Sequence, residues 1–468
     1  MIYTLIFRKR RSQWNNLKNR STLLILVTHV QAGPQNHALL EKSSRLTWVR
    51  KNLTLFILMK NLILTYRKDQ FYFIKNNFNG AIFKFDADHY SRFIRGDEEI
   101  YSRLKLKKFF VIEEPEDTLS IFVLTNYSCN LSCPYCFERH KNSFLLSCDD
   151  WNKFFNKLEG FLVGKNLRKI DITFTGGEPL VNFKCVVDIT DSIKMFAAKN
   201  SLLVQFSIIT NGTLLTPFVL DFLNKNNFFV QITFDGVKKV HDSIRCFSNG
   251  MGTYDLILEK LERMTNFKNL KIVSRINISS HDFSLYQSLI DHLMVFYPKV
   301  GVYIDFVDVP PESELFLNNE EKIEIFCQYL RIMTKNGRRD FYNYYEGGRC
   351  MLRNKMSFAI DPSLSFYRCY SFAGTEYLKF KNYEGLLANS LTNDYSCPYK
   401  DCEFYSFCMG GCVYKKYILS GDADIFCKRD FLMEMNSLIF LSEIYKNDLP
   451  INFKELLSHV EYSQIDFH

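Results

Sequence analysis

Three cysteines in the first third of the chain have the spacing of a metal site. Cys129, Cys133 and Cys136 fall within eight positions, in the segment Cys-Asn-Leu-Ser-Cys-Pro-Tyr-Cys, which we name the cysteine loop. An iron–sulfur cluster is held by thiolates that converge from a short stretch of chain. Because the cysteine loop supplies three thiolates, one iron of a four-iron cluster would keep an open position. The spacing therefore predicts a metal loop that binds a further molecule at its free iron.

A second group of cysteines lies in the C-terminal part of the chain. Its members are Cys350, Cys369, Cys397, Cys402, Cys408, Cys412 and Cys427. One structural zinc ion would use only four of these thiols. In a chain of this length, thiols in two groups indicate metal binding in a reducing cytosol rather than disulfides. The cysteines outside both groups are expected to be small buried hydrophobes.

The composition is that of an ordinary globular protein with room for more than one domain. The chain has 468 residues, of which 47% are hydrophobic and 24% charged. The net charge of +8 is modest and the basic residues are spread out, so no nucleic-acid surface is required. No apolar run approaches the ~18 residues of a membrane span. We therefore expect a cytoplasmic protein with neither nucleic-acid nor membrane partners.

Residues 1–58 differ from the rest of the chain. A basic run, Arg8–Arg11, precedes a short apolar stretch, Ser21–Val30, which weakly resembles a signal peptide. The apolar run is short, the basic segment is long, and export would be out of place for a cluster-binding protein. We expect a disordered or non-native extension, with Met59 as a plausible start.

Beyond Pro115 the chain alternates apolar strand-like runs with helical stretches. The strands are predicted at residues 119–125, 170–175, 203–210, 228–234, 270–278 and 302–307. Strands separated by helices demand parallel pairing with right-handed crossovers. The predicted fold class is therefore α/β, and an open six-unit relative of the (β/α)8 barrel is the natural closure.

Polar and glycine-rich motifs follow the first four of these strands. The cysteine loop follows the first, Gly176-Gly177-Glu178-Pro179 the second, Asn211-Gly212 the third and Asp235-Gly236 the fourth. Each motif alone could be a plain turn. In a barrel of this kind the ligand groups sit at the carboxyl ends of the strands. Four motifs in register therefore indicate one shared site.

The cysteine loop, with an aromatic residue before its last cysteine and the GGEP motif one helix later, resembles the radical S-adenosylmethionine (SAM) enzymes. The resemblance implies SAM at the open iron of a [4Fe–4S] cluster. An electron from the cluster would cleave SAM to methionine and a 5′-deoxyadenosyl radical, which takes a hydrogen atom from the substrate. The protein positions one C–H bond and excludes water and oxygen.

The resemblance also implies how the GGEP motif contacts SAM. Glu178 would hold the methionine amine of SAM with its carboxylate. Gly176 and Gly177 would let the backbone approach the ligand, and Pro179 would hold the turn.

Five further residues receive a predicted role, four from the resemblance and one from the energetic cost of burying a charge. Tyr135 would pack near the adenine and Asn211 near the adenosine of SAM. Thr233 and Asp235 match a strand end, S-x-D-G, whose hydroxyl and carboxylate face the active-site cavity, so Asp235 is the candidate catalytic residue. Arg275 would be costly to bury unpaired, so it pairs with Asp235 or a neighbour, or meets the SAM carboxylate.

A short stretch after Asp235 matches an HDxxR pattern that is often found at this place in the family. Its residues are His241, Asp242 and Arg245. For these three we expect an ordinary salt bridge at a helix start.

The second cysteine group, with Cys408-Met-Gly-Gly-Cys412 in particular, resembles the SPASM extension of radical SAM maturases, which carries two auxiliary [4Fe–4S] clusters. Carried over by position, the ligands of the first auxiliary cluster would be Cys350, Cys369 and Cys412. Those of the second would be Cys397, Cys402, Cys408 and Cys427. One iron of the first auxiliary cluster would then lack a protein thiolate.

The chain departs from the SPASM pattern at two places. Leu364 stands where a glycine is usual, so the turn at Asp361-Pro362 must be made differently. Four residues separate Cys397 from Cys402 instead of two, which makes Cys397 the least supported ligand.

These patterns divide the chain into five parts. Residues 1–58 are the extension, 59–116 a small α+β module, 117–325 the radical SAM core, 326–430 the SPASM extension and 431–468 a helical tail. The module could simply pack against the core. By its position it also resembles the leader-binding modules of peptide-modifying enzymes.

The resemblance implies an enzyme that matures a ribosomally made peptide by a crosslink or an oxidation, served by a flavodoxin- or ferredoxin-type reductant. An alternative is an anaerobic sulfatase maturase that makes formylglycine. Met356 stands where a further cysteine is expected in those maturases, which speaks against this alternative. A non-catalytic iron–sulfur electron carrier or zinc scaffold would not need GGEP, the Asn-Gly turn or Asp235.

Overall fold

The computed structural model describes residues 61–76, 81–107, 117–138, 144–162, 165–338, 351, 356–376, 379–382, 385–386, 412–415, 429–450 and 452–465. The chain divides into two compact units. The smaller unit joins Met1–Val111 to Glu461–His468, and the larger unit is Ile112–Val460. Both ends of the chain therefore belong to the smaller unit.

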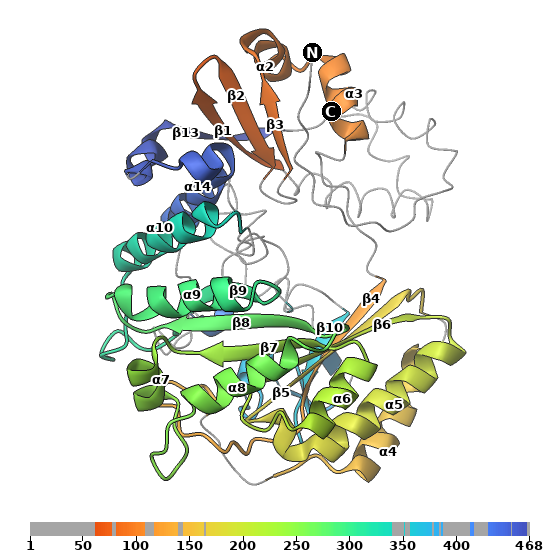
Figure 1. Ribbon diagram of the computed structural model, residues 1–468. Helices are drawn as coiled ribbons and strands as arrows, with labels where there is room; N and C mark the ends of the chain where they lie inside the picture. The colour runs from red at the N-terminus through yellow and green to blue at the C-terminus, as the bar shows by residue number, and fades with distance from the viewer. Residues whose placement is uncertain are drawn as a thin grey trace, which may run out of the picture. The chain divides into compact units, whose positions relative to one another are not determined.

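The larger unit contains, over the described ranges, a nine-stranded sheet in the order β12-β11-β10-β4-β5-β6-β7-β8-β9. Six neighbouring strands run parallel in chain order (Figure 1): β4 (Thr118–Leu124), β5 (Lys169–Thr175), β6 (Leu203–Thr210), β7 (Phe229–Phe234), β8 (Lys271–Ile278) and β9 (Gly301–Phe306). The sequence predicted all six to within one residue at either end. A mixed α/β fold with a parallel sheet is confirmed.

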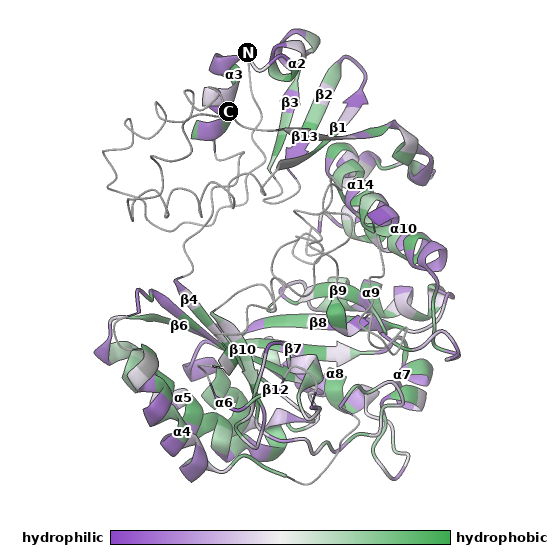
Figure 2. Ribbon diagram, turned by 180° about the vertical axis from the view of Figure 1, so that it is seen from behind, coloured by the Kyte–Doolittle hydropathy of each residue, from purple (hydrophilic) through white to green (hydrophobic). Residues whose placement is uncertain are grey.

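Helices connect the parallel strands. They are α4 (Cys148–Leu162), α5 (Phe183–Lys199), α6 (Pro217–Lys225), α7 (Lys238–Ile244), α8 (Tyr254–Met264), α9 (Ser284–Phe296) and α10 (Asn319–Lys335). Figures 1 and 2 show α4, α5 and α6 side by side along the sheet. Their buried faces are apolar, and Trp151 of α4 is fully buried against Phe155. Capping residues next to a helix help to define where it begins. For example, α10 begins with a capping box between Asn318 and Glu321.

The C-terminal part of the chain extends this sheet beyond β4. Strand β10 (Ser357–Ile360) pairs parallel with β4 and antiparallel with β11 (Phe366–Tyr367), which pairs with β12 (Lys379–Phe380). The turn between β10 and β11 contains the predicted departure at Leu364. Leu364 has φ 62, the left-handed conformation that favours glycine. Asp361 holds this turn, because its Oδ1 accepts from the backbone N–H groups of Ser363 and Ser365, both at 2.9 Å.

The tail predicted as helical is only partly so. Helix α14 (Arg429–Tyr445) is followed by the short 3-10 helices η6 (Lys446–Asp448) and η7 (Phe453–His459), but the chain then forms strand β13 (Val460–Ile465). This strand lies next to β1 in the sheet of the smaller unit. Val460 and Tyr462 alternate with polar residues, a pattern that favours a strand.

The smaller unit has an α+β fold. In the part that the structure describes, its sheet has the order β13-β1-β2-β3, with β1 (Asn61–Lys68), β2 (Phe71–Asn76) and β3 (Ile82–Phe85) antiparallel. Helices α2 (Ala87–Ile94) and α3 (Glu98–Leu106) each begin after an aspartate cap, Asp86 or Asp97. Phe93 is buried between the rings of Phe85 and Tyr101.

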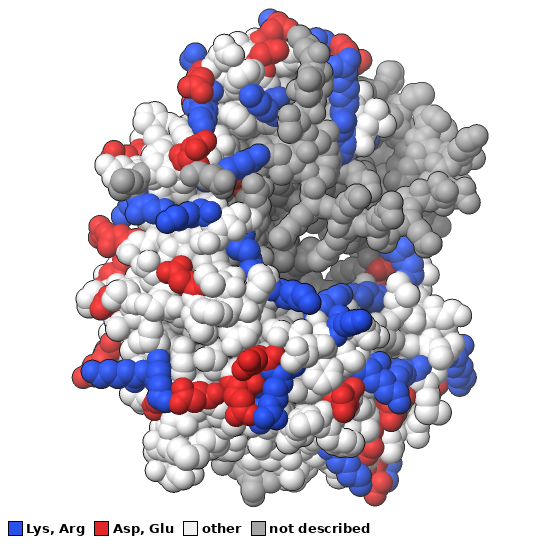
Figure 3. All heavy atoms as spheres, in the orientation of Figure 1, with Lys and Arg blue, Asp and Glu red and all other residues white. Residues whose placement is uncertain are grey.

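The described helices include none that is long and apolar enough to cross a membrane. Figure 3 shows lysines and arginines interspersed with acidic residues over the coloured part of the visible face. This agrees with the spread of basic residues in the sequence.

Candidate functional site

The cysteine loop follows the carboxyl end of β4, where the sequence placed it. Its three thiols are half-buried. The backbone N–H of Ser132 donates to the carbonyl of Cys246 at 2.9 Å, and Leu131 forms an isolated bridge with Phe247. Burial raises the pKa of the Cys133 thiol to about 11, and Cys136 and Cys129 are near enough to raise it further. The three thiols therefore act on one another.

The spacing of these thiols does not suit a single metal ion. In the described part of the chain no group of three or more His, Cys, Asp or Glu side chains is arranged to hold one ion. In a four-iron cluster each thiolate binds a different iron, so the sulfurs are farther apart than around one ion. Three neighbouring thiols on one loop therefore fit a four-iron cluster better than a single metal ion.

The GGEP motif packs directly against the chain that leads into the cysteine loop. Gly176 has φ 124, and a Cβ there would lie 2.3 Å from the carbonyl oxygen of Asn126. A Cβ at Gly177 would lie 2.1 Å from the carbonyl oxygen of Ser128. The backbone N–H of Glu178 donates to the same oxygen at 2.8 Å. In the structure the two glycines allow one stretch of backbone to pack closely against another. The approach of a ligand to the same backbone stays a prediction.

Glu178 is a buried carboxylate at the centre of the motifs. Its Oε1 accepts from the hydroxyl of Thr210 at 2.7 Å and from the N–H of Leu180 at 3.1 Å, while Oε2 accepts from the N–H of Asn211 at 2.7 Å. Burial raises the pKa of Glu178, and these hydrogen bonds oppose the rise. Over the described ranges Glu178 makes no ion pair. Oε2, with one donor, can accept a second, so this carboxylate fits an ammonium ligand. Pro179 is buried beside it and begins a 3-10 helix (Pro179–Asn182).

Asn211 is both a turn residue and a contact to the cysteine loop. Its Oδ1 accepts from the backbone N–H and the hydroxyl of Thr213 at 2.9 and 2.7 Å. Its Nδ2 donates to Oδ1 of Asn130 at 2.8 Å and lies 3.8 Å from the sulfur of Cys129. The Asn-Gly turn therefore holds the first end of the cysteine loop.

Asp235 joins the other end of the loop to the parallel strands. The phenol of Tyr135 donates to its Oδ1 at 2.5 Å, and Nε of Arg245 donates to its Oδ2 at 2.7 Å. The same phenol accepts from Nη2 of Arg245 at 3.0 Å and from Nδ2 of Asn277 at 2.8 Å. Burial raises the pKa of Tyr135 well above its ordinary value, so the phenol is protonated. Asp235 is fully buried and ion-paired.

The HDxxR residues do more than the predicted salt bridge. Arg245 reaches the site, and Nδ1 of His241 accepts from the N–H of Asp235 at 3.2 Å. Asp242 accepts from the N–H groups of Thr253 and Tyr254 at the start of α8. The spacing of the motif gave no sign of the contacts of His241 and Arg245, because both depend on where β7 places Asp235.

Arg275 pairs with a neighbour rather than with Asp235. Its Nη2 lies 2.8 Å from Oδ2 of Asp305, and its Nε donates to Oδ1 of Asn277 at 2.8 Å. Thr233 is buried at the end of β7, and its hydroxyl makes no hydrogen bond within the described residues. Sequence reasoning did not identify Asn130, Asn277 or Arg245 as site residues.

Part of the second cysteine group lies beside the cysteine loop. Cys369 is buried in an apolar cluster with Tyr127 and Val413. The ring of Phe137, the residue after Cys136, lies 6.0 Å from the rings of both Tyr370 and Tyr414. Cys412 is half-buried. The predicted ligands that lie outside the described residues are Cys350, Cys397, Cys402, Cys408 and Cys427.

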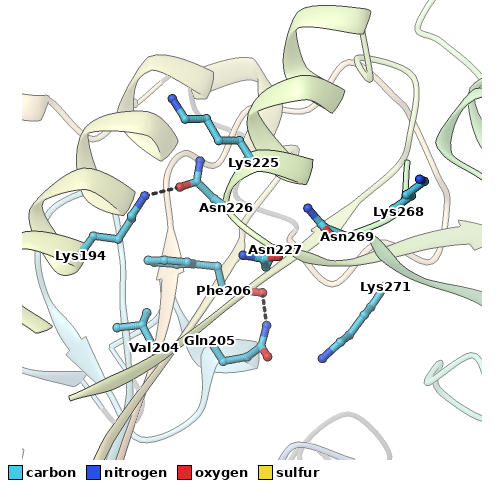
Figure 4. Close-up of a pocket in the computed structure, with 10 residues that line it drawn as sticks. All are labelled: Lys194, Val204, Gln205, Phe206, Lys225, Asn226, Asn227, Lys268, Asn269 and Lys271. Carbon is cyan, nitrogen blue, oxygen red and sulfur yellow. Dashed lines mark hydrogen bonds between the residues drawn. The ribbon is translucent and has the colours of Figure 1, made fainter. Parts of the chain in front are cut away.

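A hollow of about 570 Å³ lies elsewhere on the larger unit. Figure 4 shows Lys194 pointing toward Asn226 across it, with a hydrogen bond of 2.7 Å. The lining also includes the first residues of β6 and of β8. It therefore lies at the amino ends of the strands, whereas the motif residues lie at the carboxyl ends.

Comparison with known proteins identifies one domain of the chain. Residues 123–278, which contain every motif of the shared site, match the family model of the radical SAM superfamily. The chain therefore contains a radical SAM domain. It is 26% identical over 329 residues to a cysteine-type anaerobic sulfatase-maturating enzyme of Clostridium novyi (strain NT), covering 61% of this chain and 85% of that relative.

Two further similarities extend this finding. The radical SAM cyclopropyl synthase TigE of Paramaledivibacter caminithermalis is 25% identical over 226 residues, which cover 45% of this chain and about half (47%) of TigE. A solved structure of native anSMEcpe with bound AdoMet has a TM-score of 0.56 and 17% identity, covering 72% of this chain and 99% of that chain. The second similarity shows a shared fold. The radical SAM family implies that the enzyme uses SAM and a [4Fe–4S] cluster.

Proposed function

We propose that this radical SAM enzyme matures a ribosomally made peptide, and that its first cluster is held by Cys129, Cys133 and Cys136. The observation that carries the radical SAM site is the set of hydrogen bonds that joins the cysteine loop, after β4, to the motifs after β6 and β7 through Asn211 and Asp235. The motif after β5 is joined to Ser128, the residue before the loop, through the backbone N–H of Glu178. Such bonds hold a metal loop in one geometry, which chemistry on a bound ligand requires.

When bound, the cluster and SAM would supply the radical that removes a hydrogen atom from the substrate. The chain's own residues would position SAM. Glu178 would accept a hydrogen bond from the ammonium group at Oε2, which has room for one more donor. Asn211 and the ring of Tyr135 would lie against the adenosine part, and Thr233 offers a hydroxyl without a partner in the described structure. Asp235 is ion-paired and buried, so we assign it to positioning rather than to proton transfer.

The rest of the chain would complete a SPASM-type maturase. We propose that the six parallel strands form a partial (β/α)6 barrel and that two auxiliary [4Fe–4S] clusters bind the second cysteine group. Cys369 and Cys412 would belong, with Cys350, to the first auxiliary cluster, and the nearby rings of Tyr370 and Tyr414 pack against Phe137 at the end of the cysteine loop. The smaller unit would recognise a leader peptide, and a flavodoxin- or ferredoxin-type protein would supply electrons.

Formylglycine formation in a sulfatase is a second candidate. It is supported by the similarity to the Clostridium novyi maturase, which covers most of that relative. Met356, in place of a further cysteine, favours peptide maturation. Both candidates act on a peptide or protein substrate.

Anaerobic reconstitution tests the proposal. With dithionite and SAM, we expect the protein to form 5′-deoxyadenosine and to hold about twelve iron atoms per chain, as three four-iron clusters require. Absence of 5′-deoxyadenosine would refute the radical SAM site, and zinc without sulfide would support a scaffold instead. Mass spectrometry of two substrates separates the candidates. A precursor peptide encoded beside this gene should be modified, whereas formylglycine in a sulfatase peptide would favour the second candidate.

A further inference from the structure

Residues 241–247, which include the HDxxR residues, contact the cysteine loop; we call them the platform. We propose that Arg245 is a positioning residue for the first cluster: through Tyr135 it sets where Cys133 and Cys136 lie. The inference rests on the proposed function, because it concerns the cluster that these thiols would hold.

Two backbone contacts hold the cysteine loop on this platform. The N–H of Ser132 donates to the carbonyl of Cys246, the residue after Arg245, at 2.9 Å. Leu131, one residue before Ser132, forms an antiparallel bridge with Phe247, one residue after Cys246. Arg245 is therefore next to the point where the two segments join, and its side chain extends from there toward the loop.

The side-chain contact acts on the part of the loop that carries two thiols. Tyr135 lies between Cys133 and Cys136 in the chain, and its phenol accepts from Arg245 at 3.0 Å while donating to Asp235 at 2.5 Å. Because Arg245 also donates to Asp235 at 2.7 Å, the guanidinium, the carboxylate and the phenol close a triangle. The planar guanidinium presents its donors in fixed directions, so it orients both partners at once.

A second layer of contacts holds Arg245 itself. The hydroxyl of Thr253 donates to the carbonyl of Arg245 at 2.6 Å, so it must accept from Nε2 of His241, which lies at 3.0 Å. Nδ1 of His241 then accepts from the N–H of Asp235 at 3.2 Å. Burial lowers the pKa of His241 to about 4, which agrees with a neutral ring. This series of hydrogen bonds runs from Asp235 through His241 and Thr253 to Arg245, and it therefore holds both residues of the ion pair in place.

Stability alone does not account for this arrangement. A buried ion pair loses the hydration of both charges, and an apolar pair of similar volume is often as stable. Arg245 and Asp235 are both buried. Their contact with Tyr135 extends the pair to the cysteine loop, so the charges determine the position of the loop as well as their own.

The test uses the reconstituted full-length holoenzyme with three variants. Tyr135→Phe removes the phenol but keeps the ring, and Arg245→Lys keeps the charge but loses the planar fork. Tyr329→Phe is the matched control, because it also removes one buried phenol hydrogen bond, to the carbonyl of Val302 at 2.9 Å, far from the motifs in sequence. The measurements are the electron paramagnetic resonance (EPR) spectrum of the reduced protein with and without SAM, the SAM dissociation constant, iron content and thermal unfolding.

We expect Tyr135→Phe to weaken SAM binding at least about tenfold and to alter the SAM-dependent EPR signal, with Arg245→Lys intermediate and Tyr329→Phe like wild type. Loss of iron from both Tyr135→Phe and Arg245→Lys, with full iron content in Tyr329→Phe, would support the inference equally. Wild-type spectra and SAM affinity in both Tyr135→Phe and Arg245→Lys would overturn it, and if one variant does not fold, the other decides. A wild-type protein without any SAM-dependent signal would instead refute the proposed function.

Discussion

Replacing Glu178 by glutamine tests whether this buried carboxylate holds the ammonium group of SAM. The change keeps the size of the side chain and removes its charge. One carboxylate oxygen accepts from Leu180 and Thr210, and the other from Asn211. In either orientation the new NH2 group faces a backbone N–H, of Leu180 or of Asn211. A buried donor without an acceptor costs ~1–3 kcal/mol, which we expect as a lower free energy of unfolding.

SAM binding should fall as well. A hydrogen bond to a charged group is worth ~1.5–3 kcal/mol, and every 1.4 kcal/mol is a tenfold change in affinity. We therefore expect Glu178→Gln to bind SAM roughly ten- to hundredfold more weakly than the wild type. Equilibrium binding of SAM to the reconstituted protein measures the loss of affinity, and thermal unfolding measures the loss of stability.

Thr210→Val is the matched control. It removes one donor to the same carboxylate, at 2.7 Å, and leaves the charge in place. We expect a stability loss of ~1 kcal/mol and nearly unchanged SAM affinity. If Glu178→Gln binds SAM as tightly as the wild type, the ammonium role is wrong. Equal weakening in both variants would also refute it, because the cause would then be a displaced loop.

Three further changes test other parts of the structure. Gly177→Ala should displace the cysteine loop, because its Cβ would lie 2.1 Å from the carbonyl oxygen of Ser128, so iron content after reconstitution should drop; full iron content would contradict this packing. The pKa of His241 is lowered by burial from 6.5 to about 4, so only the unfolded chain gains this proton between those values. Stability is therefore lost as pH falls through this window, by up to ~1.4 kcal/mol per pH unit, and His241→Gln should flatten that slope in denaturant unfolding; an unchanged slope would point to another group. Deletion of residues 460–468 removes β13 from the smaller unit, so limited proteolysis should cut residues 61–107 faster while the larger unit stays protected. Equal protection of both units would mean that β13 adds little.

The parallel strands could be predicted from the sequence because each is a short apolar run between helical stretches. That pattern depends on neighbours in the chain, and β6, for example, begins and ends at the predicted residues 203 and 210. The strand-end motifs could be predicted for the same reason. Once parallel pairing is accepted, geometry brings all carboxyl ends to one edge. The cysteine loop therefore falls beside Glu178 and Asn211 without any knowledge of side-chain contacts.

Other features depend on contacts between distant parts of the chain. Strand β13 looked like the end of a helical tail, because its pairing partner β1 begins near residue 61. Leu364 marked a departure from a glycine pattern, yet only the structure shows that Asp361 holds leucine in the left-handed conformation. The hydrogen bonds of Asp361 offset part of the conformational cost, which residue type alone does not reveal.

The sequence by itself predicted the chemistry of the site, namely which thiols would bind metal and which carboxylate would meet a cation, and it determined at which strand ends these groups lie. Tertiary structure alone decided how these groups are held. Tyr135, Asp235, Arg245 and Asn277 meet at one phenol although they come from four separate segments. Residue type alone does not reveal these partners. A buried charge needs an opposite charge close to it, and the fold decides which one is near. Composition and spacing name the reactive groups, but only packing brings Arg245 to the cysteine loop and Arg275 to Asp305.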